Sequence, residues 1–247
     1  MLNMTTSRRT RVLITASAPF AGLPRSASHE VAKAIDAEGL EFAELTVAIL
    51  PVDYAAIPGL VADLIANVVP DVAIGLGVEL GAPTIRLETT ALNFADFAIA
   101  DNFGRFIRST IPFPDEPEAR SGSWPAPSIA GQLRDAGIPA IVSHHAGTHL
   151  CNLTYYALLR GLQTLNPAAL CGYAHVALLP DQVADFISAQ DRLADTAPTT
   201  DVILPSMPLD MQIAGIRLVL NAAVRASHAA MNGSPVLAAE VAAESSR

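Results

Sequence analysis

The sequence has little cysteine, little charge and few aromatic side chains: its 247 residues include 2 cysteines, 16% charged residues and 5% aromatic residues. Two cysteines are too few for the disulfide framework of a small secreted protein, so we expect a reducing compartment, the cytoplasm. The low charge, together with 51% hydrophobic residues, is also unlike a disordered chain. The composition therefore indicates a globular protein with a sizeable core of small aliphatic side chains.

Basic residues are scarce as well, since 15 Lys and Arg stand against 24 Asp and Glu, a net charge of -9. Such a surface repels phosphate backbones, and the only basic cluster is Arg8, Arg9 and Arg11 near the start. No apolar run reaches the roughly 18 residues that a membrane span requires. The first residues pass directly into a strand-like run, without the apolar region of a signal peptide. We therefore expect neither a nucleic-acid partner nor a membrane partner.

Short apolar runs alternate with segments of helical periodicity along the chain. The runs that predict strands are 11–17, 42–52, 71–78, 140–146 and 171–180. The segments that predict helices are 26–39, 57–70, 127–139, 152–165 and 208–227. Because strands that alternate with helices form βαβ units, we predict a single α/β domain. Its mostly parallel, twisted sheet would have helices on both faces, an α/β/α sandwich.

The domain boundaries follow from the same pattern. Residues 1–10 are expected to form a flexible leader, residues 11–227 the domain, and residues 228–247 a tail. In the first predicted helix, Ser28 is the expected N-terminal cap and Gly39 the expected stop. Residues 103–127 are rich in Pro, Ser, Gly and charge, so we predict a long surface loop there.

Residues 143–152, SHHAGTHLCN, place three histidines just ahead of a cysteine. Zinc needs three or four converging ligands, and His145 and His149 have a spacing that suits a helix. Gly147 between them and the preceding strand argue against a helix there, and no second cluster of ligand residues stands elsewhere. Histidines that are hydrogen-bonded at a strand end are the simpler interpretation, so we predict no metal.

Cys151 itself has a second interpretation, as a nucleophile. It opens the predicted helix 152–165, and a helix N-terminus lowers the pKa of a thiol and offers backbone N–H groups to an oxyanion. His175 lies at the end of another predicted strand, where it could meet Cys151 at the carboxyl edge of the sheet. The pattern alone leaves this open, because a free cysteine in apolar surroundings is usually part of the core.

Three motifs together resemble the pyroglutamyl peptidase I (pyrrolidone-carboxylate peptidase) family of cysteine peptidases over residues 11–225. SHHAGTHLCNLTYY is similar to the family's Ser-x-x-Ala-Gly-x-(Phe/Tyr)-(aliphatic)-Cys-Asn motif, and GYAHVALLPDQ to its histidine segment. GAPTIRLETTALN matches the frame around the family's glutamate, while DNFG and PSMPLDM fall in register. The motifs occur in the family's order and at its separations, which makes the resemblance specific.

The resemblance implies a role for each matching residue. Cys151 would be the nucleophile, His175 the general base and Glu88 the group that orients or polarises the site, with Asp96 as an alternative orienting residue. Cys171 would be structural. We expect no cofactor. The family commonly forms dimers or tetramers, so the resemblance implies a homo-oligomer.

The sequence departs from the family where the substrate is recognised. The family's Gly-Phe-Glu-Pro-Phe-Gly-Gly is ASAPFAG here, so Phe20 is retained but Ser17 replaces an aromatic residue. In the family, aromatic residues of this loop clasp the lactam of the substrate. His144 and His149 stand where the family has Asn and an aromatic residue, so we predict that Ser17, Phe20, His144 and His149 form the substrate wall.

Three arginines of the family are also missing, because their positions hold Ala82, Thr89 and Ala98. Loss of three guanidinium groups near one crevice should change the charge that the pocket accepts.

These observations together predict a cysteine-dependent hydrolase of an amide bond that works through a thioester acyl-enzyme. Its leading activity is removal of N-terminal pyroglutamate from peptides. A diverged amidohydrolase for another small cyclic or acyl amide, and a non-catalytic binding member of the fold, are the alternatives. The expected partner is thus a peptide or small-molecule amide.

Overall fold

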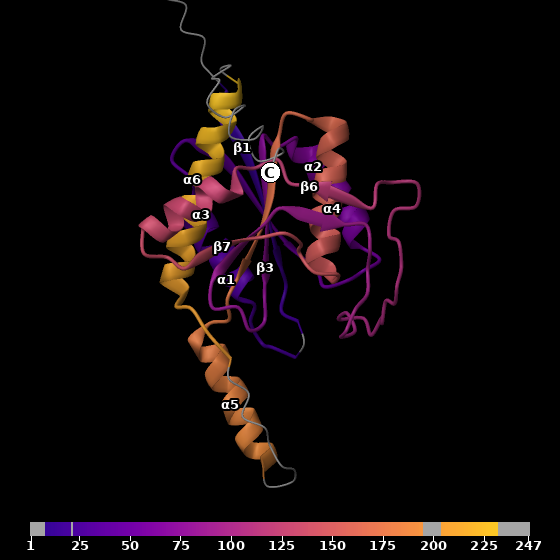
Figure 1. Ribbon diagram of the computed structural model, residues 1–247, viewed down its shortest axis with the longest axis vertical. Helices are drawn as coiled ribbons and strands as arrows, with labels where there is room; N and C mark the ends of the chain where they lie inside the picture. Colours follow the sequence, from indigo (N-terminus) through magenta and orange to yellow (C-terminus); the bar gives the residue numbers. More distant parts are fainter. Residues whose placement is uncertain (1–7, 21, 195–203, 232–247) are drawn as a thin grey trace, which may run out of the picture.

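A six-stranded sheet of order β2-β1-β3-β8-β4-β7 forms the centre of the computed structural model, which describes residues 8–20, 22–194 and 204–231 (Figure 1). Its strands are β1 (Thr10–Ser17), β2 (Ala43–Leu50), β3 (Val72–Val78), β4 (Ile85–Glu88), β7 (Ala140–Ser143) and β8 (Leu170–Val176). All neighbouring strands are parallel except β4 and β8, which are antiparallel. The predicted α/β class and the mostly parallel sheet are confirmed.

Helices cover both faces of this sheet because the central strands are apolar on both sides. Three helices pack on one face: α1 (Ala27–Glu38), α3 (Ala126–Asp135) and α6 (Leu209–Met231). On the other face lie α2 (Ile57–Val68) and α4 (Leu150–Leu165). Alternate residues of β1 divide accordingly, with Val12 and Ile14 in the first core and Leu13 in the second. Figure 1 shows α5 (Pro180–Ala194) extending away from the sheet.

The ends of α1 agree only in part with the sequence patterns. Gly39 follows the last turn with φ 71°, a conformation that glycine adopts without steric cost, so the predicted stop is confirmed. The cap prediction was wrong by two residues, because Ser26 occupies the N-cap position and Ser28 lies inside the helix. The Ser28 side chain is buried, and its hydroxyl contacts that of Ser26 at 3.0 Å.

Several elements between 80 and 125 were not predicted. β4 carries the charged residues Arg86 and Glu88 within four positions, so it lacks the apolar run that marks the other strands. β5 (Thr90–Leu92) and β6 (Ala119–Ser121) form a separate two-stranded sheet. The prediction of a surface loop over 103–127 is therefore wrong in its last part. There β6 is paired and Trp124 is buried.

The two ends of the chain lie partly outside the described residues. Residues 1–7 of the predicted leader and 232–247 of the predicted tail belong to this part. α6 continues beyond 227 to Met231, and the His228 ring contacts the Thr10 hydroxyl at the start of β1. Among the helices of residues 8–20, 22–194 and 204–231, none combines the length and hydropathy of a membrane span.

Candidate active site

The segment SHHAGTHLCN connects the end of β7 to the start of α4. The strand ends at Ser143, Gly147 makes the turn with φ 77°, and the helix begins at Leu150. Cys151 therefore lies in the first helical turn, as the sequence predicted. Asn152 fixes this turn to the neighbouring chain, because its amide accepts a hydrogen bond from the Leu92 nitrogen and donates one to the Leu92 oxygen, at 2.7 and 2.8 Å.

The side chains of the three histidines in this segment lie in different surroundings. His144 is exposed and its Nδ1 lies 3.4 Å from the Thr89 hydroxyl. His145 accepts a hydrogen bond from the Gly147 nitrogen, at 3.2 Å. The His149 ring packs on Phe97, with centroids 4.0 Å apart. Within the described ranges, no three His, Cys, Asp or Glu side chains form a group that could hold a metal ion.

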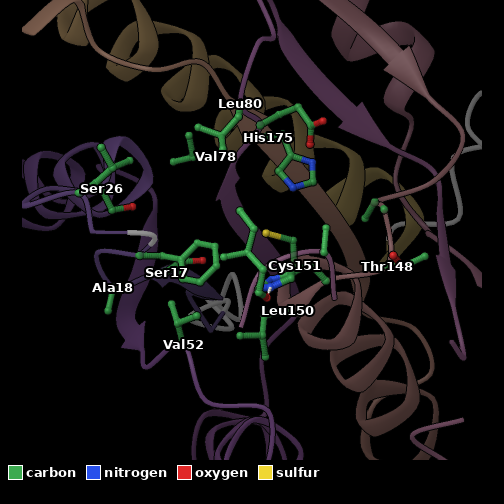
Figure 2. Close-up of a pocket in the computed structure, with 18 of the residues that line it drawn as sticks. Ser17, Ala18, Ser26, Val52, Val78, Leu80, Thr148, Leu150, Cys151 and His175 are labelled. Atoms are coloured by element: carbon green, nitrogen blue, oxygen red, sulfur yellow. Dashed lines mark hydrogen bonds between the residues drawn. The ribbon is translucent and has the colours of Figure 1, made fainter. Parts of the chain in front are cut away.

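Cys151 instead faces His175, which comes from the end of β8 (Figure 2). The Nδ1 atom of His175 lies 2.8 Å from Oε1 of Glu88, on the adjacent antiparallel strand β4. This bond leaves the other ring nitrogen, Nε2, for the thiol. The structure thus brings together three residues that are far apart in the sequence, in the order thiol, imidazole and carboxylate.

Two glycines of β3 make room for this arrangement. Gly77 is opposite His175 in the strand pairing. A β-carbon on Gly77 would stand 2.7 Å from the Cys151 sulfur and 2.9 Å from Cδ2 of His175. A β-carbon on Gly75 would meet the ring of Tyr173 at 2.2 Å. Glycine within a strand is a sign of such close approach, so this signal was present in the sequence and was missed.

The charges of the three groups depend on one another. Burial alone would raise the pKa of Cys151, but the charge of His175 and hydrogen bonds from His175 and Tyr173 bring it below its ordinary value. Burial would lower the pKa of His175, yet the Cys151 thiolate and the Glu88 carboxylate raise it to about 10. The arrangement therefore favours a thiolate beside an imidazolium. Cys171, by contrast, is buried among apolar residues, and burial raises its pKa well above the ordinary value.

Glu88 is held in place from several directions. Its side chain is 1% exposed, and Nε of Arg86 lies 3.4 Å from Oε1. The same arginine donates a hydrogen bond to the Ser143 hydroxyl, at 2.8 Å. The Glu88 carbonyl accepts hydrogen bonds from the Trp124 indole and the Tyr155 hydroxyl, at 3.0 and 3.1 Å. Burial would raise the pKa of Glu88, but His175, Ser143 and Arg86 keep it lower than usual, so the carboxylate stays ionised.

A pocket of about 370 Å³ opens onto Cys151 and His175. Figure 2 shows Val78 and Leu80 beside His175, and Val52 and Leu150 below Cys151. The charged residues Arg25, Glu79 and Asp96 also line the pocket, but most of its exposed surface is apolar, so the pocket suits a largely uncharged acyl group.

The predicted substrate wall is only partly present. Ser17, Phe20 and His149 line the pocket, and the rings of Phe20 and His149 are 5.0 Å apart. His144 does not line it, because β7 ends one residue earlier and directs this side chain to the surface.

The structure also places Asp96 and the three positions that lack the family's arginines in different surroundings. Asp96 lines the pocket, but its carboxylate lies 3.5 Å from Arg108, and the orienting position beside His175 is occupied by Glu88. Ala98 borders the pocket, whereas Ala82 and Thr89 do not. The expectation that all three positions surround one crevice was therefore wrong.

Comparison with known proteins agrees with this geometry. The family model described as pyroglutamyl peptidase matches residues 10–226. The chain belongs to the pyroglutamyl peptidase family. It is 33% identical over 216 residues to the pyrrolidone-carboxylate peptidase of Streptomyces coelicolor, a match that covers 87% of this chain and 93% of that protein. The corresponding protein of Pyrococcus furiosus is 28% identical over 214 residues, with 87% and 98% covered.

Solved structures of the family show the same fold. The pyrrolidone carboxyl peptidase of Pyrococcus furiosus superposes with a TM-score of 0.81 at 27% sequence identity, and the match covers 88% of this chain and 100% of that one. This member of the pyroglutamyl peptidase family therefore retains the family's sheet and helices over nearly its whole length.

Proposed function

We propose that this protein is a cysteine hydrolase that removes N-terminal pyroglutamate from peptides. One observation carries the proposal: Cys151, His175 and Glu88 meet in hydrogen-bonding order at the pocket. The family relationship and the names of the relatives support the substrate.

In the proposed reaction, the Cys151 thiolate attacks the carbonyl carbon of the pyroglutamyl residue. The negative charge that develops on the carbonyl oxygen faces the first turn of α4, whose leading N–H groups have no intrahelical acceptor. His175 then gives its proton to the departing amine as the C–N bond breaks, which leaves a thioester on Cys151.

Hydrolysis of the thioester completes the cycle. The neutral imidazole of His175 takes a proton from water, and the resulting hydroxide attacks the thioester carbonyl. Collapse of this intermediate releases the free acid and restores the thiolate beside the imidazolium. Glu88 holds the ring so that Nε2 faces the sulfur throughout, and its charge stabilises the imidazolium.

The test is hydrolysis of a pyroglutamyl aminomethylcoumarin amide by the purified protein. We expect turnover that Cys151→Ala abolishes and Cys171→Ala leaves intact, because Cys171 is buried away from the pocket. A wild-type protein that is alkylated at Cys151 but releases no coumarin would overturn the assignment of pyroglutamate.

A second candidate is hydrolysis of a different small acyl or cyclic amide. It is favoured by the pocket wall, where the small residues Ser17 and Ala98 replace an aromatic residue and an arginine of the family, leaving an apolar space of about 370 Å³. A panel of coumarin amides with other lactam and acyl groups separates the two candidates. A higher kcat/KM for one of these amides than for the pyroglutamyl amide would favour the second.

We further propose a cytoplasmic homo-oligomer, a dimer or tetramer, in which residues 11–227 carry the chemistry. A nucleophilic thiol functions in its reduced form, which supports a reducing compartment. Large apolar side chains at the surface, such as Phe42 (70% exposed) and Phe103 (62% exposed), support self-association. Light scattering coupled to gel filtration would measure the mass, and a value of 25.8 kDa would contradict the oligomer.

A further inference from the structure

Tyr173 reaches the reacting sulfur from beneath the pocket. It lies two residues before His175 on β8 and is 1% exposed. Its hydroxyl oxygen would be 2.8 Å from a β-carbon on Gly77, the same point that is 2.7 Å from the Cys151 sulfur. The thiol and the phenol therefore converge on one small space, which exists only because residue 77 is glycine.

The ring of Tyr173 is fixed in this position. It lies against the bare backbone of Gly75, and its centroid is 5.6 Å from that of Tyr155 and 5.1 Å from that of His175. Burial, followed by the nearby charge of Cys151, raises the pKa of Tyr173 well above its ordinary value. The phenol thus keeps its proton and faces the sulfur as a donor.

Ser17 ends β1 one residue after Ala16, which is paired with Leu76, so it lies next to Gly77, and it lines the pocket together with Cys151. From this position its hydroxyl is a hydrogen-bond partner of Tyr173 that lowers the pKa of the phenol, as expected when serine donates to the phenol oxygen. Ser17 stands where the family pattern has phenylalanine, which has no hydroxyl to donate. Ser17 therefore lacks the aromatic substrate contact of the family and instead contacts Tyr173, the residue that faces the nucleophile.

We propose that Tyr173 is a further catalytic residue, whose hydroxyl donates a hydrogen bond to the Cys151 thiolate, and that Ser17 is the positioning residue that orients this hydroxyl. The inference rests on the proposed role of Cys151 as nucleophile. A chain of two hydrogen bonds polarises each member, which strengthens the bond to the charged sulfur.

The hydrogen bond from Tyr173 affects both the attack of the sulfur on the substrate and its departure from the acyl-enzyme. It stabilises the thiolate before attack, so a larger fraction of the protein is ready to react at neutral pH, although each thiolate becomes a weaker nucleophile. When the acyl-enzyme hydrolyses, sulfur departs as a thiolate, and the same donor stabilises the departing charge.

The experiment measures the thiol directly, by the rate of iodoacetamide alkylation of Cys151 as a function of pH. Tyr173→Phe keeps the ring and removes only the oxygen. Since a hydrogen bond to a charged group has a free energy that corresponds to about one to two pKa units, we expect the pKa of Cys151 to rise by this amount. Ser17→Ala should give a smaller rise, and Ser17→Ala added to Tyr173→Phe should give no further rise.

Tyr156→Phe is the matched control. Tyr156 is as deeply buried as Tyr173, but its hydroxyl donates to the Pro117 carbonyl and does not approach the sulfur. An unchanged pKa of Cys151 in Tyr173→Phe would overturn the proposal. So would a Ser17→Ala effect that adds fully to that of Tyr173→Phe. Ser17 lies on the pocket wall, so this variant remains informative if Tyr173→Phe does not fold.

Because the measurement contains no substrate, its result is separate from that of the turnover assay. If the pKa shifts appear and the pyroglutamyl amide is not cleaved, the substrate assignment fails and the role of Tyr173 stands. If wild-type Cys151 shows the pKa of a free thiol, about 8.5, and Tyr173→Phe leaves it there, the role of Tyr173 fails.

Discussion

Glu88 and His175 face each other across the only antiparallel pair in the six-stranded sheet, with Oε1 2.8 Å from Nδ1. They are 87 residues apart in the chain. The antiparallel register of β4 and β8 pairs Glu88 with Tyr173, so His175, two residues further along β8, is the diagonal neighbour of Glu88 on the same face of the sheet. The antiparallel pairing is therefore a structural requirement for the proposed chemistry.

Replacement of Glu88 by Gln should lower kcat by about 10²- to 10⁴-fold, because the amide neither stabilises the imidazolium nor enforces the same ring tautomer. The carboxylate also raises the pKa of His175. We therefore expect the alkaline limb of the pH–rate profile to move to lower pH. Steady-state kinetics over pH would show both effects, and an unchanged alkaline limb would contradict the assigned role.

The pH dependence of alkylation should differ between the two cysteines. The pKa of Cys151 is lowered and that of His175 is raised to about 10, so the reactive ion pair persists from below the ordinary thiol range up to about pH 10. The apparent values belong to the pair as a whole. Alkylation followed by mass spectrometry should label Cys151 at neutral pH and leave the native protein unlabelled at Cys171. Equal labelling of both would exclude an activated thiol.

Gly77→Ala should abolish turnover, because the new β-carbon would collide with the Cys151 sulfur and with His175. Overpacking of this kind destabilises a protein by about 1–3 kcal/mol, which thermal or urea unfolding would measure. Gly59→Ala in α2 is the matched control, since nothing lies within 4 Å of its β-carbon position. There we expect full activity and a gain of about 0.5–1 kcal/mol. Normal turnover in Gly77→Ala would show that the close approach is unnecessary.

Arg86→Ala should lower kcat about two- to fivefold, a modest change because the guanidinium is partly exposed and screened by solvent. Arg86 contributes to the lowered pKa of Glu88, so its removal should also move the acid limb of the pH–rate profile to higher pH. Arg86→Lys keeps the positive charge, but a lysine lacks the planar guanidinium that contacts Glu88 and Ser143 together. We therefore expect its kcat to lie between those of Arg86→Ala and the wild type.

The control for this experiment is Arg217→Ala, which breaks an exposed pair with Glu38 on another part of the molecule. It should leave the pH–rate profile as it is in the wild type. If Arg86→Ala had no more effect than this control, the contact with Glu88 would be only structural.

Sequence patterns were sufficient for much of the fold. The apolar strands, Gly39 as a helix stop and the position of Cys151 at a helix start all follow from local hydrophobicity and backbone preferences, which neighbours in sequence largely determine. The family motifs supplied the three residues of the proposed mechanism. Local rules failed for β4, because a short strand with two charges is stabilised by its neighbours and not by its own composition.

The sequence by itself determined the α/β architecture, because this depends on the periodicity of apolar residues, and its family motifs predicted the thiol, the imidazole and the carboxylate of the site. Only the tertiary structure decided which side chains share the pocket. It excluded His144 from the pocket wall, paired Asp96 with Arg108, brought Tyr173 to the sulfur through two glycines of β3, and placed Ser17 beside Tyr173. The physical reason is that such contacts join separate strands, whose relative positions depend on packing across the whole sheet.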